Sequence, residues 1–242
     1  MIMLFTPEEI AEGKFLLLNK PLQWTSHDVI ARLRGPLKTF TGNKKLKVGH
    51  AGTLDPLASG LLIVLTGKAT KRADETQNLD KEYTGIITLG GVTASYDLET
   101  PVESITVTEH ITDLLVQQAA QHFTGAFMQL PPAHSSIKIQ GKPAYTYARE
   151  GEEMKMRPRP IEIFQFEIIA FRNPHIDFRV HCSKGTYIRS LAHDVGQFLG
   201  CGGYLSALCR TKIGNYHLEN AYTLDTVIDF LRQSNQHLHQ SQ

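Results

Sequence analysis

Apolar residues recur along the chain with two different periods. Short apolar runs bounded by turn residues are typical of buried strands, and they predict strands at residues 15–18, 61–65, 83–89, 161–171, 176–182 and 204–213. Apolar positions three or four residues apart are typical of helices packed on a sheet, and they predict helices at residues 26–33, 68–77, 108–122, 187–199 and 224–232. Because both hairpins and helices connect these strands, we expect an α+β fold with a mixed, largely antiparallel sheet flanked by helices.

Residues from about 130 to 160 differ in composition from the rest of the chain. They are rich in proline, lysine, arginine and tyrosine, with a short predicted strand at 136–140 and a predicted helix at 145–149. We interpret this segment as an insert that leaves the core. The sequence shows no internal repeat, and we expect one domain spanning residues 1–242.

The composition is that of an ordinary globular chain. It has 242 residues, of which 41% are hydrophobic and 20% are charged, so disorder is not indicated. No apolar run approaches the roughly 18 to 20 residues that span a bilayer, and the first residues lack a signal-peptide layout. We therefore expect a cytoplasmic protein with no membrane association. The three cysteines Cys182, Cys201 and Cys209 form no C-x-x-C pair, which predicts neither a disulfide framework nor a metal site.

Charge is distributed unevenly, although the net charge is only +1. Residues 32–72 hold nine Lys or Arg against the single acid Asp55, a local charge of +8. Residues 82–121 hold six acids and no Lys or Arg. A solvated charge run is the simpler explanation, but one carboxylate among nine cations also fits a polyanionic substrate that approaches an acidic catalytic group.

A glycine-punctuated turn carries that carboxylate. Asp55 lies in the run Lys47-Val-Gly-His-Ala-Gly-Thr-Leu-Asp-Pro-Leu-Ala-Ser-Gly-Leu-Leu62, directly before a predicted strand. The glycines let the backbone approach a ligand closely, and Pro56 restricts the chain after the acid. Judged from Asp-Pro alone, the commoner role for Asp55 is a helix cap with Pro56 at the first helical position.

The whole run resembles the signature G-H-x-G-x-L-D-P-x-A-x-G of the TruB family of tRNA pseudouridine synthases, and the resemblance extends from about Phe15 to Leu231. It implies the pseudouridine synthase fold, a large bent sheet with an active cleft across its middle. It also implies that Asp55 is the catalytic nucleophile for isomerising the uridine at tRNA position 55, in the T arm, after flipping that base out of its stack.

Two further motifs supply the other catalytic candidates that the resemblance implies. The run Cys182-Ser-Lys-Gly-Thr-Tyr-Ile-Arg189 is similar to C-S-x-G-T-Y-I-R, in which the Arg pairs with the catalytic Asp. Tyr83 matches the K-x-Y motif, in which the ring stacks on the target base and the phenol is a candidate for the C5 proton. An arginine on a helix surface and a tyrosine in the core are the simpler alternatives for Arg189 and Tyr83.

Five more residues match family positions around the substrate. The resemblance implies that His50 contacts the flipped nucleotide, that Tyr187 and Leu208 line its pocket, that Lys20 lies near the cleft, and that Lys71 meets RNA phosphate. Core packing is the alternative for Tyr187 and Leu208, and a surface position is the alternative for Lys20.

The chain departs from the family pattern in two places. His134 stands where the family has tyrosine in the RNA-clamping insert. Many relatives continue into a C-terminal PUA-like RNA-binding domain, and we expect none in this chain. We expect a single pseudouridine synthase catalytic domain, residues 1–242, that binds the T-arm stem-loop of tRNA as a monomer without an obligate protein partner.

The implied reaction breaks a C–N bond and forms a C–C bond without net redox change, so we expect no cofactor and no metal. A tRNA-binding or folding chaperone with incidental or lost catalysis is the alternative function. A phosphate-binding NTPase is excluded because G-x-x-x-x-G-K-[ST] is absent from the sequence.

Overall fold

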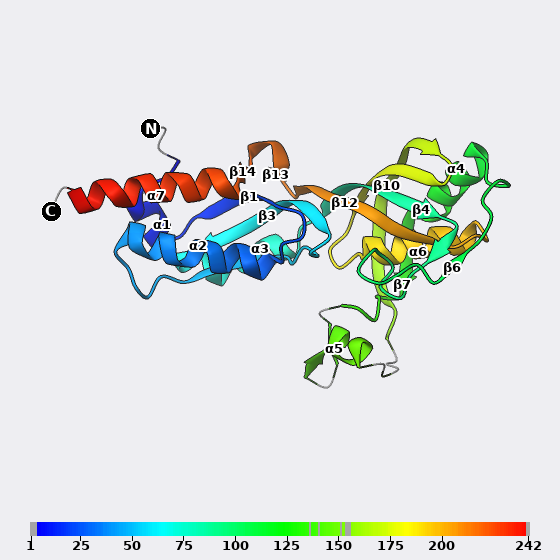
Figure 1. Cartoon of the computed structure of the whole chain (residues 1–242), viewed down its shortest axis with the longest axis horizontal. Coiled ribbons are helices and arrows are strands. Elements are labelled where there is room, and N and C mark those ends of the chain that lie inside the picture. Colours follow the sequence, from blue (N-terminus) through cyan, green and yellow to red (C-terminus); the bar gives the residue numbers. More distant parts are fainter. Residues whose placement is uncertain (1–3, 136, 140, 151, 153–155, 241–242) are drawn as a thin grey trace. The chain divides into compact units, whose positions relative to one another are not determined.

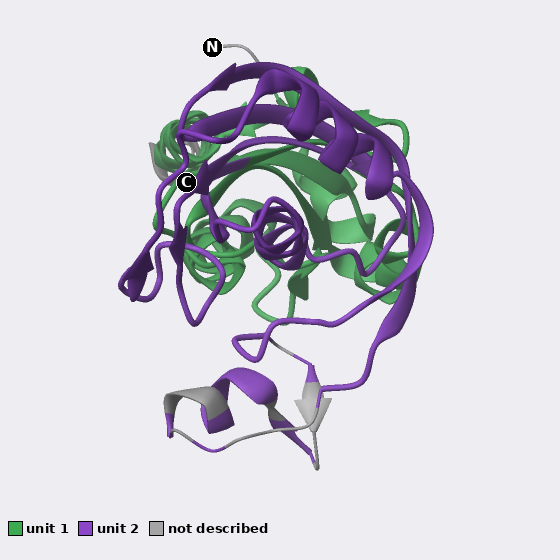
Figure 2. Ribbon diagram, turned by 90° about the vertical axis from the view of Figure 1, so that its right-hand side faces the viewer, with its two compact units in different colours: residues 1–81, 209–242 green, residues 82–208 purple. Residues whose placement is uncertain are grey.

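The computed structural model describes residues 4–135, 137–139, 141–150, 152 and 156–240. It divides into two compact units, which we treat separately (Figure 2). Unit 1 comprises Met1–Lys81 and Cys209–Gln242, and unit 2 comprises Glu82–Leu208. Whether both units work as one catalytic domain stays a prediction.

Unit 1 is built from strands and helices taken from both ends of the sequence (Figure 1). Its elements are α1 (Pro7–Glu12), β1 (Phe15–Lys20), α2 (Ser26–Thr41), β2 (Val48–Ala51), β3 (Ala58–Thr66), the 3-10 helix η1 (Gly67–Arg72), α3 (Ala73–Gln77), the end of β12 (Gly203–Ile213), β13 (Tyr216–His217), the 3-10 helix η2 (Leu218–Asn220), β14 (Tyr222–Thr223) and α7 (Leu224–Gln240). Its strands follow the order β14-β1-β3-β12, with β2 on β3 and β13 on β12. β1 pairs with β14 in parallel and with β3 antiparallel.

Unit 2 contains the central part of the chain. Its elements are β4 (Lys81–Leu89), β5 (Gly91–Val92), β6 (Ser104–Ile105), α4 (Asp113–His122), β7 (Gly125–Gln129), β8 (Lys138–Ile139), β9 (Lys142–Pro143), α5 (Ala144–Arg149), β10 (Arg159–Arg172), β11 (His175–Cys182), α6 (Ile188–Phe198) and the start of β12. Its strands follow the order β12-β4-β11-β10-β7, and β10 pairs antiparallel with both β11 and β7. The parallel pairing of β1 with β14, beside the antiparallel pairings of β1 with β3 and of β10 with β11 and β7, confirms the expected mixed α+β fold.

The core of unit 1 has two layers because successive side chains of a strand point to opposite faces of a sheet. Leu16 and Leu18 of β1 pack with Leu62 and Val64 of β3 against α1, α2 and α7. The intervening β3 residues pack on the other face with η1 and the end of β12. β3 is therefore buried on both faces, which explains its continuous apolar sequence.

α2 is longer than the predicted helix 26–33. Thr25 caps it through a capping box with Asp28, and the helix continues through Pro36 to Thr41. A proline inside a helix removes one backbone hydrogen bond. Buried Leu33, Leu37 and Phe40 anchor both sides of this point in the core, so tertiary packing offsets the local cost.

The other predicted elements are mostly confirmed, with shifted ends. The predicted helix 68–77 is the 3-10 helix η1 followed by α3. The predicted helix 108–122 begins only at Asp113, since the Thr112 side chain accepts from Leu115 N at the N-cap. α1, β2 and β7 were not predicted. In the insert, β8 covers Lys138–Ile139, and Ser136 and Gln140 of the predicted strand lie outside the described residues.

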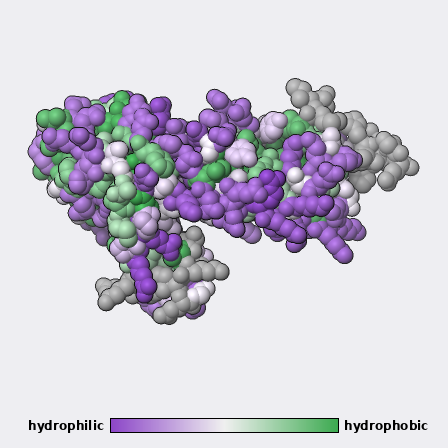
Figure 3. Space-filling model, turned by 180° about the vertical axis from the view of Figure 1, so that it is seen from behind, coloured by the Kyte–Doolittle hydropathy of each residue, from purple (hydrophilic) through white to green (hydrophobic). Residues whose placement is uncertain are grey.

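The surface is predominantly polar on the face that Figure 3 shows, with apolar patches scattered among hydrophilic residues. Within the part of the chain that the structure describes, no helix is both long enough and apolar enough to cross a membrane.

Candidate functional site

The turn between β2 and β3 is held by an unbroken series of hydrogen bonds. Five successive backbone carbonyls, from Gly52 to Pro56, each accept a hydrogen bond. The donors are Arg210 for Gly52 and Thr53 (3.0 and 3.3 Å), Ser26 Oγ for Leu54 (3.1 Å), Ala58 N for Asp55 (3.1 Å), and Gln23 N and Lys20 Nζ for Pro56 (2.8 and 3.5 Å). This turn therefore fixes the backbone from which the half-buried Asp55 side chain projects.

Asp55 does not cap a helix. The chain makes a turn at Pro56 and enters β3 at Ala58, so the simpler alternative for the Asp-Pro pair is wrong. Leu54, by contrast, is buried beside Asp55, and Ser26 Oγ accepts from its backbone N–H at 2.9 Å while donating to its carbonyl. Ser26 is available for this role because Thr25 provides the cap of α2.

Two buried cations support the turn. Lys20 and Arg210 are 0% and 1% exposed, and Lys20 Nζ also donates to Trp24 O at 2.6 Å. Burial lowers the pKa of Lys20 to about 8, the charge of Asp55 acts in the opposite direction, and the charge of Arg210 lowers it further. Lys20 is therefore not a surface lysine, and it remains mostly protonated at neutral pH.

Gly60 permits the close approach of Arg210 to the turn. Its φ is +106°, and a Cβ at this position would lie 2.4 Å from the Arg210 carbonyl oxygen. Both the backbone conformation and the contact exclude a larger residue. The Arg210 guanidinium also donates from Nε to Leu61 O at 2.8 Å, so this arginine joins β3 to the turn.

His50 lies on β2, opposite Val64 of β3, and is half-buried. Burial, followed by the charges of Arg210 and His27, lowers the pKa of His50. The imidazole is therefore neutral at physiological pH. Its buried Nδ1 has no hydrogen-bond partner among the residues that the structure describes, so a ligand could supply one.

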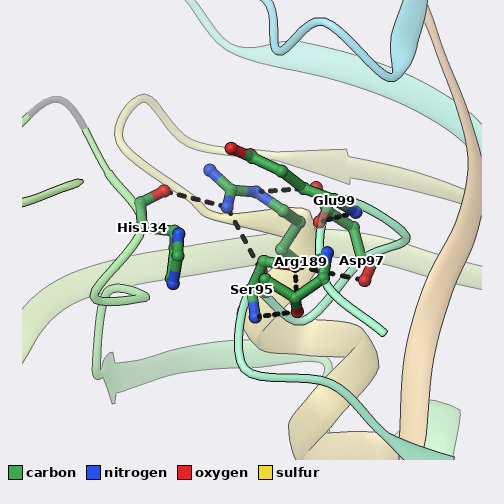
Figure 4. A network of polar contacts seen from close by, with 6 residues as sticks. Ser95, Asp97, Glu99, His134 and Arg189 are labelled. Atoms are coloured by element: carbon green, nitrogen blue, oxygen red, sulfur yellow. Dashed lines mark hydrogen bonds and ion pairs between the residues drawn. The ribbon is translucent and has the colours of Figure 1, made fainter. Parts of the chain in front are cut away.

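Arg189 is the centre of a polar network in unit 2 (Figure 4). One terminal guanidinium nitrogen donates to the carbonyls of Ser95 (3.2 Å) and His134 (2.9 Å). Arg189 Nε lies 3.7 Å from Asp97 Oδ2, and both side chains are buried. Arg189 is thus not a helix-surface residue. Its expected pairing with Asp55 would join the two units and stays a prediction.

His134 contributes to this network through its backbone. Because the Arg189 contact uses the His134 carbonyl, it does not depend on whether a histidine or a tyrosine side chain stands at this position. The departure from the family pattern at residue 134 is therefore compatible with an intact arginine network.

The other predicted site residues of unit 2 lie on neighbouring elements. Tyr83 is buried on β4, and Leu208 is half-buried on β12. Tyr187 is the N-cap residue of α6, and the amide of Gln129 donates to its carbonyl at 3.0 Å and accepts from its N–H at 2.8 Å. Burial alone does not separate pocket lining from core packing, so the roles of these three residues stay predictions.

Most basic residues of the segment 32–72 are exposed. Lys38 is half-buried, and Arg32, Arg34, Lys44, Lys45, Lys47, Lys68, Lys71 and Arg72 are exposed. Asp55 is the only negatively charged residue in the sequence of this segment. Unit 1 therefore presents many cations to solvent, and Lys71 on η1 is accessible to a phosphate.

Some residues that shape the site were not predicted. These residues are Arg210, Ser26 and Asp97, and each contacts a partner between 28 and 158 positions away in the sequence. Contacts over such separations leave no local motif. The signal for Arg210 was a charged residue inside the predicted strand 204–213, which has only one other charged residue, Lys212. Among the described residues, no group of three or more His, Cys, Asp or Glu is arranged to hold a metal ion.

Comparisons with known proteins agree with the motifs. Residues 38–188 match the model of the TruB family pseudouridylate synthase N-terminal domain, and residues 189–241 match that of the tRNA pseudouridylate synthase B C-terminal domain. The chain is 49% identical to tRNA pseudouridine synthase B of Flavobacterium johnsoniae over 89% of this chain and 95% of that protein. It is 46% identical to the protein of that name from Parabacteroides distasonis, over 92% and 94%.

Solved structures also resemble this one. A chain of a Cbf5-Nop10-Gar1 complex matches 95% of this chain with a TM-score of 0.70 and 28% identity. A chain of an H/ACA RNP bound to a substrate RNA containing 2'-deoxyuridine matches 93% with a TM-score of 0.66 and 29% identity. This chain covers 63% and 57% of those longer chains. The fold is therefore the pseudouridine synthase fold, and the chain belongs to the TruB family of pseudouridylate synthases.

Proposed function

We propose that this chain isomerises uridine to pseudouridine in tRNA, and that its target is the uridine at tRNA position 55 in the T arm. The relatives that share 46–49% identity with it over most of their length carry the name tRNA pseudouridine synthase B. The single structural observation that supports this function best is the turn that carries Asp55, in which five successive carbonyls are held.

The reaction requires an electron-pair donor at the junction of sugar and base. In our proposal the Asp55 carboxylate attacks C1′ of the ribose as the nucleophile, and the C1′–N1 bond breaks with its electron pair leaving on the uracil, which then turns. C5 of the uracil next attacks C1′ while the bond between C1′ and the Asp55 oxygen breaks and returns the carboxylate. The C5 proton leaves, and N1 gains a proton. Atoms and electrons balance without an oxidant, a metal or water.

The remaining groups hold the nucleotide and place the acid. We propose that Tyr83 stacks on the flipped base, since base stacking on an aromatic ring offsets part of the cost of extracting a nucleotide. We also propose that its phenol oxygen accepts the C5 proton while it gives up its own proton toward the ring nitrogen that gains one. Arg189 holds the Asp55 carboxylate, because a guanidinium fork fixes direction as well as charge. His50, Tyr187 and Leu208 complete the pocket, and Lys71 contacts phosphate.

The function is tested by turnover of unmodified tRNA by the purified chain, with pseudouridine mapped position by position. We expect one product at tRNA position 55, formed without an added protein or cofactor, by a monomeric, cytoplasmic enzyme. Measured tRNA binding or refolding without any isomerisation would instead support a tRNA chaperone. Product at another uridine would overturn the assigned position while leaving the reaction intact.

Binding of tRNA should weaken steeply with salt. If about four exposed cations contact phosphates, affinity should fall roughly a hundredfold between about 50 and about 200 mM salt. The Lys44→Gln/Lys45→Gln double variant should show a shallower slope, whereas Arg232→Gln on α7, outside the basic segment and paired with Asp229, should not. A flat salt response of the unaltered chain would exclude the basic segment as the tRNA-binding surface.

A further inference from the structure

The loop of residues 93–100 is attached to α6 at two points. Ser95 and Asp97 contact Arg189, and Tyr96, between them, stacks on His193 with ring centroids 4.0 Å apart and planes 15° apart. Residues four positions apart lie on the same face of a helix, so Arg189 and His193 are neighbours on the face of α6 that contacts the loop. The loop therefore contacts α6 through both its backbone and an aromatic ring.

The backbone of Tyr96, whose ring makes the stack, has an unusual conformation. Its φ is +63°, a left-handed value that bulky residues rarely adopt. Such conformations persist where the surroundings over-determine them, and they are concentrated at functional sites. The left-handed residue lies directly between the two that touch Arg189, so its conformation sets the relative positions of the Ser95 carbonyl and the Asp97 carboxylate.

The rest of the loop is internally fastened. Ser95 and Thr100 exchange hydrogen bonds through backbone and hydroxyl groups, and Tyr96 N donates to Thr93 O at 3.2 Å. Leu205 N of β12 donates to Tyr96 O at 2.9 Å. The loop thus has a fixed shape. β12 holds its backbone at Tyr96, and the Arg189 and His193 contacts join it to α6.

His193 takes part through the face of its ring. Its Nδ1 is buried and has no hydrogen-bond partner within the described part of the chain. Burial lowers the pKa of His193, so the ring is neutral at physiological pH and offers an uncharged aromatic surface. A phenylalanine could provide the same surface without the buried nitrogen.

We propose that Tyr96 is a positioning residue whose stack on His193 places Ser95 and Asp97, and through them orients the guanidinium of Arg189. This inference rests on the proposed function, in which Arg189 acts at the reacting nucleotide. Tyr96 itself touches neither the nucleotide nor the reacting atoms in this proposal. The stack of Tyr96 on His193 thus fixes the direction in which the Arg189 guanidinium points.

The test compares two substitutions at one position. Tyr96→Asn removes the ring, and asparagine tolerates the left-handed conformation, whereas Tyr96→Phe keeps the ring and loses only the hydroxyl. We expect Tyr96→Asn to lower kcat by at least about tenfold with KM changed less than about threefold. Tyr96→Phe and His193→Phe should stay within about twofold of the unaltered chain. All assays are run well below each variant's melting temperature.

A double-mutant cycle and a spectroscopic signal separate positioning from general damage. Adding His193→Ala to Tyr96→Asn should cost little more than Tyr96→Asn alone, because both remove the same contact. The Nε–H resonance of Arg189, assigned by its disappearance in Arg189→Lys, should shift in Tyr96→Asn and not in Tyr96→Phe.

Three outcomes would overturn the inference: full activity of Tyr96→Asn, an equal loss in Tyr96→Phe, or an unmoved Arg189 resonance in Tyr96→Asn. Absence of turnover in the unaltered chain would instead reject the proposed function. The NMR comparison would then still decide whether the stack orients Arg189.

Discussion

Replacing Asp55 by asparagine should abolish isomerisation and leave tRNA binding nearly intact. The amide matches the carboxylate in size, and the substitution leaves in place the five backbone carbonyls of the turn that accept hydrogen bonds. The variant should therefore fold normally but lack the nucleophile. We expect affinity for tRNA to change by less than about tenfold, or 1.4 kcal/mol, because the exposed cations of residues 32–72 serve binding.

The matched control for this variant is Asp74→Asn. Asp74 is exposed on α3, in the same unit, and its substitution changes the net charge by the same amount. Single-turnover formation of pseudouridine and direct tRNA binding are measured for both. Asp74→Asn should retain full activity, and measurable turnover by Asp55→Asn would refute the nucleophile assignment.

Replacing Arg189 by lysine should reduce kcat by about a hundredfold or more, roughly 2.7 kcal/mol of transition-state stabilisation. Lysine keeps the positive charge but has no planar fork. A single ammonium could not reproduce the contacts of one guanidinium with the carbonyls of Ser95 and His134 and the carboxylate of Asp97. The loss should fall mainly on kcat, because the buried arginine orients a reacting group rather than binding phosphate.

Arg179→Lys provides the comparison for the same chemical change. Arg179 pairs with Glu167 at 3.1 Å on the exposed side of the β10–β11 hairpin, where an ion pair contributes little. Thermal melting of both variants checks that the folded state persists. Activity of Arg189→Lys within about twofold of the unaltered chain, a difference of roughly 0.4 kcal/mol, would show that Arg189 does not hold the catalytic acid.

Local sequence determined the elements because periodicity and turn chemistry are local properties. The apolar run at residues 61–65 predicted a buried strand, and the structure shows that this strand, β3, is buried on both faces. The two strand-like runs at 161–171 and 176–182 correspond to β10 and β11, which pair antiparallel. Pro36 shows where this reasoning fails. The local rule ends a helix there, but burial of Leu37 and Phe40 carries α2 to Thr41.

The sequence also supplied Asp55 and Arg189 as candidates, because a motif records residue types at fixed spacings, and it supplied the basic segment of residues 32–72 through a count of charges. Their catalytic and binding roles stay predictions. Tertiary structure alone decided what supports these residues. The backbone of the Asp55 turn accepts hydrogen bonds from side chains of three elements distant from it in sequence, namely Lys20, Ser26 and Arg210. Arg189 donates to carbonyls of two further segments, at Ser95 and His134. A buried cation is stabilised by carbonyls that the fold brings to it after desolvation. Its partners therefore depend on long-range chain topology, which no local pattern encodes.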